Sequence, residues 1–280
     1  MKTLKPRLLT AVIGIPAVLL ILFLSELWNP LLGIVVGLAS ALMTGEFLYA
    51  KRLLGCIPLA VVCMAYAFLM PVMVSHGSIA YIVTYLFIIA AFIVSLIYYK
   101  RLHFMNLAYA LFGTILIVFG MTAVPIACCS NGVSVSFYFV AIFLLPWMAD
   151  GGAYFIGSYF GRHKLAPNIS PKKTVEGVLG GVVACVASAL IMGLLFQLVF
   201  LGDNVRVNFF ALIVLALLDS IISIVGDLSF SLIKRNLKIK DYGSIFPGHG
   251  GMLDRCDSII FTAPLVVALS QIIPLLTIMV

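Results

Sequence analysis

Charged residues are scarce in this sequence: Asp, Glu, Lys and Arg together make up 10% of its 280 residues. A soluble domain typically carries about 25% charged residues. Hydrophobic residues account for 64%, and the mean hydropathy is +1.23. One globular core cannot bury this much apolar sequence, so we expect lipid to surround most of the chain.

Several other patterns are missing. The six cysteines form no CxxC pair and show no metal-ligand spacing, so we interpret them as small apolar residues within helices. No segment has the alternation of a membrane strand, which favours helices. No small-residue cleavage site follows the basic N-terminus and the apolar run 8–24, so we interpret this run as an uncleaved first span.

Polar, proline and glycine residues divide the chain into about nine apolar segments, and a bilayer core needs about 20 residues per helix. We therefore predict an all-α fold, a polytopic transmembrane helical bundle of about nine helices. The segments are 8–24, 31–50, 54–75, 79–99, 104–127, 135–160, 175–201, 207–234 and 256–279. We divide the chain into N-terminal transmembrane helices (1–130) and C-terminal catalytic transmembrane helices (131–280), with two cytoplasmic loops at 161–174 and 235–255.

Basic residues lie almost entirely on one side of these spans. Of the 17 Lys and Arg residues, only Arg206 falls on the side opposite the N-terminus. The positive-inside rule then places the N-terminus in the cytoplasm. The other basic residues are Lys2, Lys5, Arg7, Lys51, Arg52, Lys100, Arg101, Arg162, Lys164, Lys172, Lys173, Lys234, Arg235, Lys238, Lys240 and Arg255.

The loop 161–174 carries four basic residues and leads into a helix through Ser170-Pro171-Lys172-Lys173-Thr174. We expect Ser170 to cap that helix and Pro171 to lie in its first turn. A helix N-terminus with two adjacent lysines would bind phosphate. The alternative is an ordinary basic loop.

The segment from Lys234 to Asp257 combines basic residues, glycines, His249 and three aspartates. The glycines let backbone approach a ligand closely. His249 either contacts that ligand or fixes the shape of the loop. Asp254 and Arg255 form either part of a site or a structural ion pair.

Three aspartates interrupt apolar spans: Asp150, Asp219 and Asp227. A charge within a span is costly and usually faces a polar interior. Asp219, Ser223, Asp227, Ser231 and Arg235 repeat every four residues, which makes a polar stripe on one helix. We expect Asp227 and Asp254 to face each other across the connecting loop, where oxygen ligands near many cations suit Mg²⁺ with a nucleotide polyphosphate.

These residues resemble the signature of bacterial phosphatidate cytidylyltransferases. Blocks similar to that family also occur earlier, so the resemblance covers about 140–260. The matching residues are Ala149-Asp150, Gly152-Ala153-Tyr154, Ser170–Thr174, Gly226-Asp227-Leu228, Ser231, Lys234-Arg235, Lys240-Asp241, Gly243, Phe246–Gly251, Asp254-Arg255 and Asp257.

The resemblance implies a reaction in which the phosphate of phosphatidate attacks the α-phosphorus of CTP and pyrophosphate leaves. It also implies a Mg²⁺-dependent site with Asp227 and Asp254 as metal ligands, and a homodimer. With the orientation given by the basic residues, we expect an inner (plasma) membrane enzyme whose site faces the cytoplasm, and no nucleic acid as a partner. We assign catalytic roles to Asp227, Asp254, Lys234, Arg235 and Arg255. We assign substrate binding to Lys172, Lys173, Thr174, Lys240, Asp241, His249 and Asp150.

Two positions depart from the family pattern. Phe230 replaces the acidic residue that commonly precedes Ser231, which predicts a lower metal affinity, and Gly151 replaces a common Ser or Thr. Neither change touches the main loop.

Three other functions fit parts of the sequence. Intramembrane aspartates also mark ion paths, but a transporter usually shows repeated halves, and none is visible here. The same fold could act on another lipid, as an isoprenoid alcohol kinase or as a CTP transferase that acts on an ether lipid. A purely structural bundle would account for the small-residue faces formed by Gly177 and Gly181, and by Gly180, Ala184 and Ser188.

Overall fold

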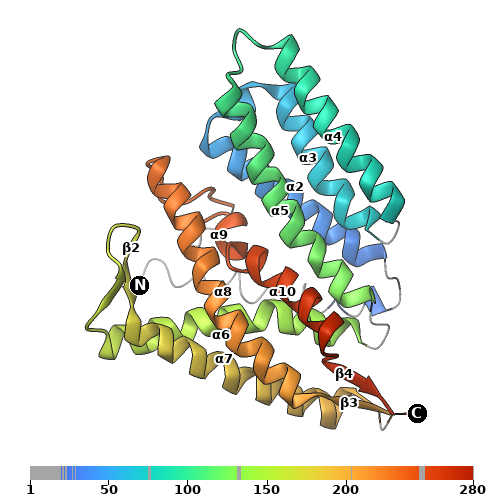
Figure 1. The fold of residues 1–280 in the computed structure, drawn as a ribbon, viewed down its shortest axis with the longest axis vertical. Coiled ribbons are helices and arrows are strands. Elements are labelled where there is room, and N and C mark those ends of the chain that lie inside the picture. The colour runs from blue at the N-terminus through green and yellow to red at the C-terminus, as the bar shows by residue number, and fades with distance from the viewer. Residues whose placement is uncertain are drawn as a thin grey trace. The chain divides into compact units, whose positions relative to one another are not determined.

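The computed structural model describes residues 20, 22, 24–26, 28, 30–74, 77–130, 134–202, 204–245 and 250–279. This part of the chain is predominantly helical, which confirms the all-α prediction (Figure 1). It forms two compact units, and neither is continuous in sequence. The first unit comprises Met1–Ile126 and Asn236–Cys256, and the second comprises Ala127–Arg235 and Asp257–Val280.

The first unit is a helical bundle in which α3 packs against both α2 and α4. Two stacked pairs of aromatic rings contribute to its packing. The ring centroids of Tyr66 and Phe87 are 4.0 Å apart, and those of Phe47 and Tyr109 are 4.3 Å apart. Its helices are α2 (Pro30–Ala50), α3 (Ile57–Met73), α4 (Gly77–Ile97), α5 (Phe104–Ser130, whose last residues belong to the second unit) and α9 (Leu253–Cys256), with a 3₁₀ turn at Leu53–Gly55.

The second unit contains four long helices and two short antiparallel ladders. The helices are α6 (Val135–Phe160), α7 (Val175–Leu195, continued by a π-helical turn at Phe196–Phe200), α8 (Phe209–Asn236, whose last residue belongs to the first unit) and α10 (Ile259–Ile272). The strands are β1 (Lys164–Ala166) paired with β2 (Ser170–Thr174), and β3 (Val205–Val207) paired with β4 (Leu276–Ile278).

Glycines bring α6 and α7 into close contact. A Cβ atom placed on Gly181 would lie 2.7 Å from the Ala149 carbonyl oxygen, and one on Gly177 would lie 2.8 Å from the Ala153 oxygen. Such small-residue faces allow helix backbones in membranes to approach closely. The small residues singled out in the sequence therefore serve packing within the bundle.

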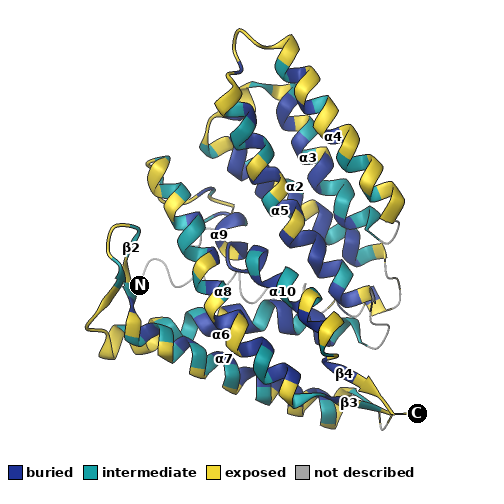
Figure 2. Cartoon of the chain, in the orientation of Figure 1, coloured by how far each residue is buried: buried dark blue, intermediate teal, exposed yellow. Residues whose placement is uncertain are grey.

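Seven described helical segments are long and apolar enough to cross a membrane. Large apolar side chains cover their outer faces, as on α4, where Tyr81 and Leu96 are more than 70% exposed (Figure 2). Such surfaces suit lipid rather than water. The chain is therefore a multi-pass membrane protein. Most of the predicted span 8–24 lies outside the described residues, so the number of spans and the orientation remain predictions.

The last predicted span, 256–279, is wrong at its end. Helix α10 stops at Ile272, and Leu276–Ile278 instead form strand β4, in which Leu276 pairs with Val207. Pro274 cannot donate a helical hydrogen bond, and the following Thr277 and Ile278 are β-branched, which favours a strand. Asn208 fixes the turn by donating its side-chain amide to the Pro274 oxygen at 3.1 Å.

Candidate active site

In the second unit, an ion pair joins strand β2 to helix α8. The ammonium of Lys173 contacts Asp227 Oδ2, and both side chains are about four-fifths buried. Ser231, one turn further along α8, donates its hydroxyl to Asp227 Oδ1 at 3.4 Å. Part of the polar stripe predicted on this helix therefore forms a connected set.

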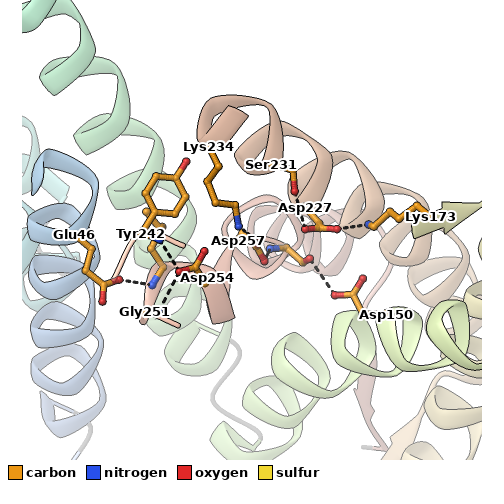
Figure 3. A network of polar contacts seen from close by, with 12 residues as sticks. Glu46, Asp150, Lys173, Asp227, Ser231, Lys234, Tyr242, Gly251, Asp254 and Asp257 are labelled. Carbon is orange, nitrogen blue, oxygen red and sulfur yellow. Dashed lines mark hydrogen bonds and ion pairs between the residues drawn. The ribbon is translucent and has the colours of Figure 1, made fainter. Parts of the chain in front are cut away.

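A second pair lies next to the first. The Lys234 ammonium is 4.0 Å from Asp257 Oδ2, and both side chains are close to nine-tenths buried. Asp257 lies within electrostatic range of Asp227, Lys234 and Asp150. The backbone amide of Ser258 donates to Asp257 at 2.9 Å, and its hydroxyl donates to Asp150 at 3.3 Å (Figure 3). Helices α6 and α8 thus supply one carboxylate each, and Asp257, two residues before α10 begins, supplies the third.

The hairpin before α7 positions Lys173. Glu176 accepts hydrogen bonds from the amides of Arg162 and His163 and lies 2.6 Å from the His163 Nδ1 atom. At the end of α8, Arg235 Nε donates to the Ile169 oxygen in the hairpin turn at 3.2 Å. These contacts tie the start of the hairpin to α7 and its turn to the end of α8, the helix that carries Asp227.

The predicted helix start at Ser170 is wrong. Residues 170–174 form strand β2, and Thr174 is the N-cap of α7, accepting from the Gly177 amide at 3.1 Å. A threonine hydroxyl in extended backbone caps a helix well, and a strand alternates its side chains. Consequently Lys173 is partly buried at the ion pair, while Lys172 is exposed, and the two lysines do not act together at a helix N-terminus.

Asp219 lies deeper in the same unit and is fully buried. Thr262 of α10 is next to it, yet neither Asp219 oxygen has a hydrogen bond of standard geometry to any described residue. Ser223, one turn along α8, is likewise fully buried with no hydroxyl partner in the described part of the chain. Asp227, Ser231 and Arg235 of the polar stripe therefore have ion-pair or hydrogen-bond partners. Asp219 and Ser223 have no hydrogen-bond partner of standard geometry in the described part of the chain.

In the first unit, Asp254 organises the loop that precedes α9. Asp254 Oδ2 accepts hydrogen bonds from the amides of Tyr242 at 2.8 Å and Gly251 at 3.0 Å. Gly250 has φ +85°, a left-handed conformation that glycine adopts without strain. Asp254 thus has a structural role in addition to any role toward a substrate.

Glu46 of α2 is a site residue that the sequence analysis missed. It is buried and accepts from the amides of Met252 at 3.0 Å and Leu253 at 2.8 Å (Figure 3). Gly243 and Gly251 pack so closely on its carboxylate that a Cβ atom at either position would collide with it. The rule applied to Asp150, Asp219 and Asp227, a carboxylate inside an apolar span, would have found it.

The structure divides the sequence-predicted residues between the two units. Asp150, Lys172, Lys173, Thr174, Asp227, Lys234 and Arg235 belong to the second unit, and Lys240, Asp241, Asp254 and Arg255 belong to the first. Lys240, Asp241 and Arg255 are exposed, whereas Asp254 is buried. His249 lies outside the described residues.

Phe230, the replacement for a family acid, is fully buried and packs edge-on against Phe261 of α10. It contributes apolar packing between α8 and α10. Gly151 has open space where a Cβ would lie, so backbone crowding does not require a glycine there.

The arrangement of the second unit suits phosphate chemistry. Two lysine–aspartate pairs, Lys173–Asp227 and Lys234–Asp257, place ammonium groups next to carboxylate oxygens. Sites that bind a metal ion together with a nucleotide combine the same two kinds of group. A model of the cytidylyltransferase family matches residues 5–273, nearly the whole chain. The chain belongs to the cytidylyltransferase family.

Curated relatives in the cytidylyltransferase family are named phosphatidate cytidylyltransferase. The one from Haemophilus influenzae is 41% identical over 128 residues, covering 46% of this chain and 43% of that protein. The Bacillus subtilis protein is 45% identical over 118 residues, covering 42% and 41%. That of Staphylococcus aureus strain COL is 43% identical over 128 residues, covering 46% of each. The aligned region thus spans less than half the length of each of these relatives.

Proposed function

We propose that this protein is a phosphatidate cytidylyltransferase, which converts CTP and phosphatidate to CDP-diacylglycerol and pyrophosphate. The observation that carries the proposal is the set of aspartates and lysines in the second unit, Lys173–Asp227 and Lys234–Asp257, within a family of cytidylyltransferases. The names of the curated relatives supply the lipid substrate.

This reaction needs little covalent chemistry from the protein. An oxygen of the phosphatidate phosphate attacks the α-phosphorus of CTP, and the bond from that phosphorus to the bridging oxygen breaks. Pyrophosphate leaves with the electron pair. A phosphate monoester has a second pKa of about 6, so it is already an anionic nucleophile near neutral pH. The protein must align the two substrates and neutralise their charge.

The lysines of the second unit are suited to that neutralisation. Lys173 and Lys234 are held by carboxylates at the inner end of α8, so their ammonium groups are positioned before a substrate binds. Preorganised charge costs no rearrangement during the reaction. We assign these lysines, with Arg235 and Arg255, to the phosphates of the two substrates. Lys172, Lys240, Asp241, His249, Thr174 and Asp150 remain proposed substrate-binding residues.

The carboxylates of the proposed site suit a Mg²⁺ ion that is bound together with a nucleotide. Within the described residues, no group of three or more His, Cys, Asp or Glu side chains is placed to hold a metal by itself. Mg²⁺ is usually bound by one or two carboxylates, with water and substrate phosphates completing its shell. We propose Asp227 and Asp254 as its protein ligands. Bound there, Mg²⁺ would neutralise the triphosphate and the departing pyrophosphate.

We place the enzyme in the inner (plasma) membrane as a homodimer, with its site facing the cytoplasm. The proposed substrates meet at such a surface: phosphatidate stays in the bilayer, whereas the charged CTP stays in water. The concentration of Lys and Arg on one side of the spans supports this orientation.

The decisive experiment is incubation of the purified protein with labelled CTP and phosphatidate in detergent, with and without EDTA. We expect labelled CDP-diacylglycerol only when Mg²⁺ is present. Asp227→Asn removes one charge from the site and should lower kcat at least about 100-fold, the order of loss seen when a charge-stabilising group is removed. The matched control is Asp219→Asn, the same change two turns earlier on α8, which should leave kcat within about 3-fold because Asp219 touches neither lysine pair.

Turnover retained by Asp227→Asn would remove that residue from the metal role. If product forms with an isoprenoid alcohol and not with phosphatidate, the proposed nucleotide site stands but phosphatidate is not the lipid substrate. Ion flux in vesicles without any cytidylyl transfer would instead favour a transporter.

A further inference from the structure

The charged side chains that line one cavity of the first unit are all basic among the described residues. The cavity has a volume of about 390 Å³ and is formed where the α2–α3 and α4–α5 connections meet. Lys51, Arg52 and Arg101 line it, together with Tyr98 and Asn106. The described residues of its lining include no Asp or Glu, and none of the three cations forms an ion pair within the described part of the chain.

Topology alone does not explain this arrangement. The positive-inside rule requires Lys and Arg on one side of the membrane, but it does not require them to line a common hollow. Arg52 also has φ +59°, a left-handed conformation that is unfavourable for a residue with a Cβ atom. Cations gathered at a concave site without an acidic partner attract an anion.

The cavity lies where helices of the first unit end, and the ends of membrane helices lie near the lipid headgroups. Helices α2 and α4 end beside it, and α3 begins there after the 3₁₀ turn. Exposed tyrosines mark the same level, with Tyr49 65% and Tyr99 66% exposed. Tyrosine is enriched where a membrane protein meets the headgroup region. Leu53, Ile57 and Pro58 add an apolar side to the lining.

We propose that this cavity binds the phosphate of an anionic glycerophospholipid. The two arginines and Lys51 would hold the phosphate, Tyr98 and Asn106 would offer hydrogen bonds, and the apolar side would accept the glycerol backbone. The volume is that of a small-molecule site. The shared chemistry is phosphate recognition; the apolar lining and the headgroup depth favour a lipid over a free phosphate ion.

Two adjacent arginine and lysine residues provide a matched comparison. Arg101 lines the cavity, whereas Lys100 does not and instead lies over the Tyr99 ring at 5.9 Å. Purified full-length wild type, Arg101→Gln and Lys100→Gln are titrated with phosphatidylglycerol in detergent without CTP. Native mass spectrometry then gives the dissociation constant of the first bound lipid.

Wild type should bind one phosphatidylglycerol in preference to phosphatidylcholine. Arg101→Gln should weaken that binding about 5-fold, since one basic residue near a headgroup contributes about that factor, and Lys100→Gln should change it less than about 2-fold. Equal losses in both variants would mean diffuse surface attraction and would overturn the proposal. If Arg101→Gln fails to fold, Lys51→Gln provides the same test, with unfolding temperature as the check.

A second arm distinguishes the lipid from a free ion. Inorganic phosphate at about 10 mM should not displace the bound phosphatidylglycerol, and its displacement by phosphate would reject a lipid occupant. Because binding is measured without CTP, the result does not depend on cytidylyl transfer. Loss of selective binding with normal turnover, or the reverse, therefore identifies which of the two proposals fails.

Discussion

At the scale of single residues, strand alternation assigns different tasks to two neighbouring lysines. Successive side chains of a strand point to opposite faces. Lys173 therefore contacts Asp227, while Lys172 extends outward and is exposed. The identical charge of the two residues hides this difference in the sequence.

We predict that Lys173→Met lowers kcat/KM for CTP about 100-fold, because it removes a positioned charge and leaves Asp227 without its ammonium partner. Lys172→Met should cost less than about 5-fold, since an exposed lysine contributes mainly through screened attraction. Steady-state kinetics of both variants at fixed phosphatidate measure the difference. Equal losses of kcat/KM in the two variants would show that the contact of Lys173 with Asp227 does not contribute to catalysis.

At the scale of secondary-structure elements, one helix residue holds a loop in shape. Both carboxylate oxygens of Glu46 on α2 accept backbone amides from the segment before α9, and the glycines beside it leave room for the carboxylate. Buried amides left without an acceptor are costly, so this contact fixes the conformation around Met252 and Leu253.

Glu46→Gln is expected to loosen that loop. A glutamine side chain keeps one acceptor and turns its amide donor toward a second donor, which costs about 2 kcal/mol. Amide hydrogen exchange of a peptide covering 250–253 should accelerate at least about 10-fold, and turnover should fall with it. Gly45→Ala is the control, because its Cβ would meet only Met64 at 3.4 Å and should leave exchange unchanged. Unchanged exchange in Glu46→Gln would contradict the structural role.

The α6–α7 pair depends on backbone proximity in the same way. Gly181→Ala places a Cβ 2.7 Å from the Ala149 oxygen, so we predict a loss of about 1–3 kcal/mol in stability. Gly151→Ala, with open space at its Cβ, should be neutral or should stabilise α6 by up to about 1 kcal/mol. Thermal unfolding in detergent compares the two variants. A stable Gly181→Ala protein would show that the helices can separate without penalty.

At the scale of the whole molecule, each unit gathers basic residues from separate connections at one end. In the first unit, Lys51, Arg52 and Arg101 come from two connections and line one cavity. In the second unit, Arg235 at the end of α8 reaches the hairpin turn that precedes α7. Arg206, by contrast, lies in strand β3, next to the start of α8.

The orientation can be tested with single cysteines in a variant whose six native cysteines are replaced by alanine. Lys164→Cys should react with a membrane-impermeant maleimide only in inverted vesicles, and Arg206→Cys only in intact spheroplasts. The one-sided distribution of Lys and Arg places Lys164 on the cytoplasmic side and Arg206, the single exception, on the other. Labelling of both positions from one side would mean that the count of spans between them is wrong.

The sequence by itself determined the membrane character, most helix positions, the family resemblance and the residues on which the proposed chemistry rests. Composition, periodicity and local motifs carry that information, because lipid demands long apolar helices whatever their packing. Only the tertiary structure decided that 170–174 is a strand, that Lys173 rather than Lys172 meets Asp227, and that Glu46 supports a loop some two hundred residues later in the chain. Those outcomes depend on contacts between distant segments, and local propensity does not specify which distant groups will satisfy a buried charge or amide.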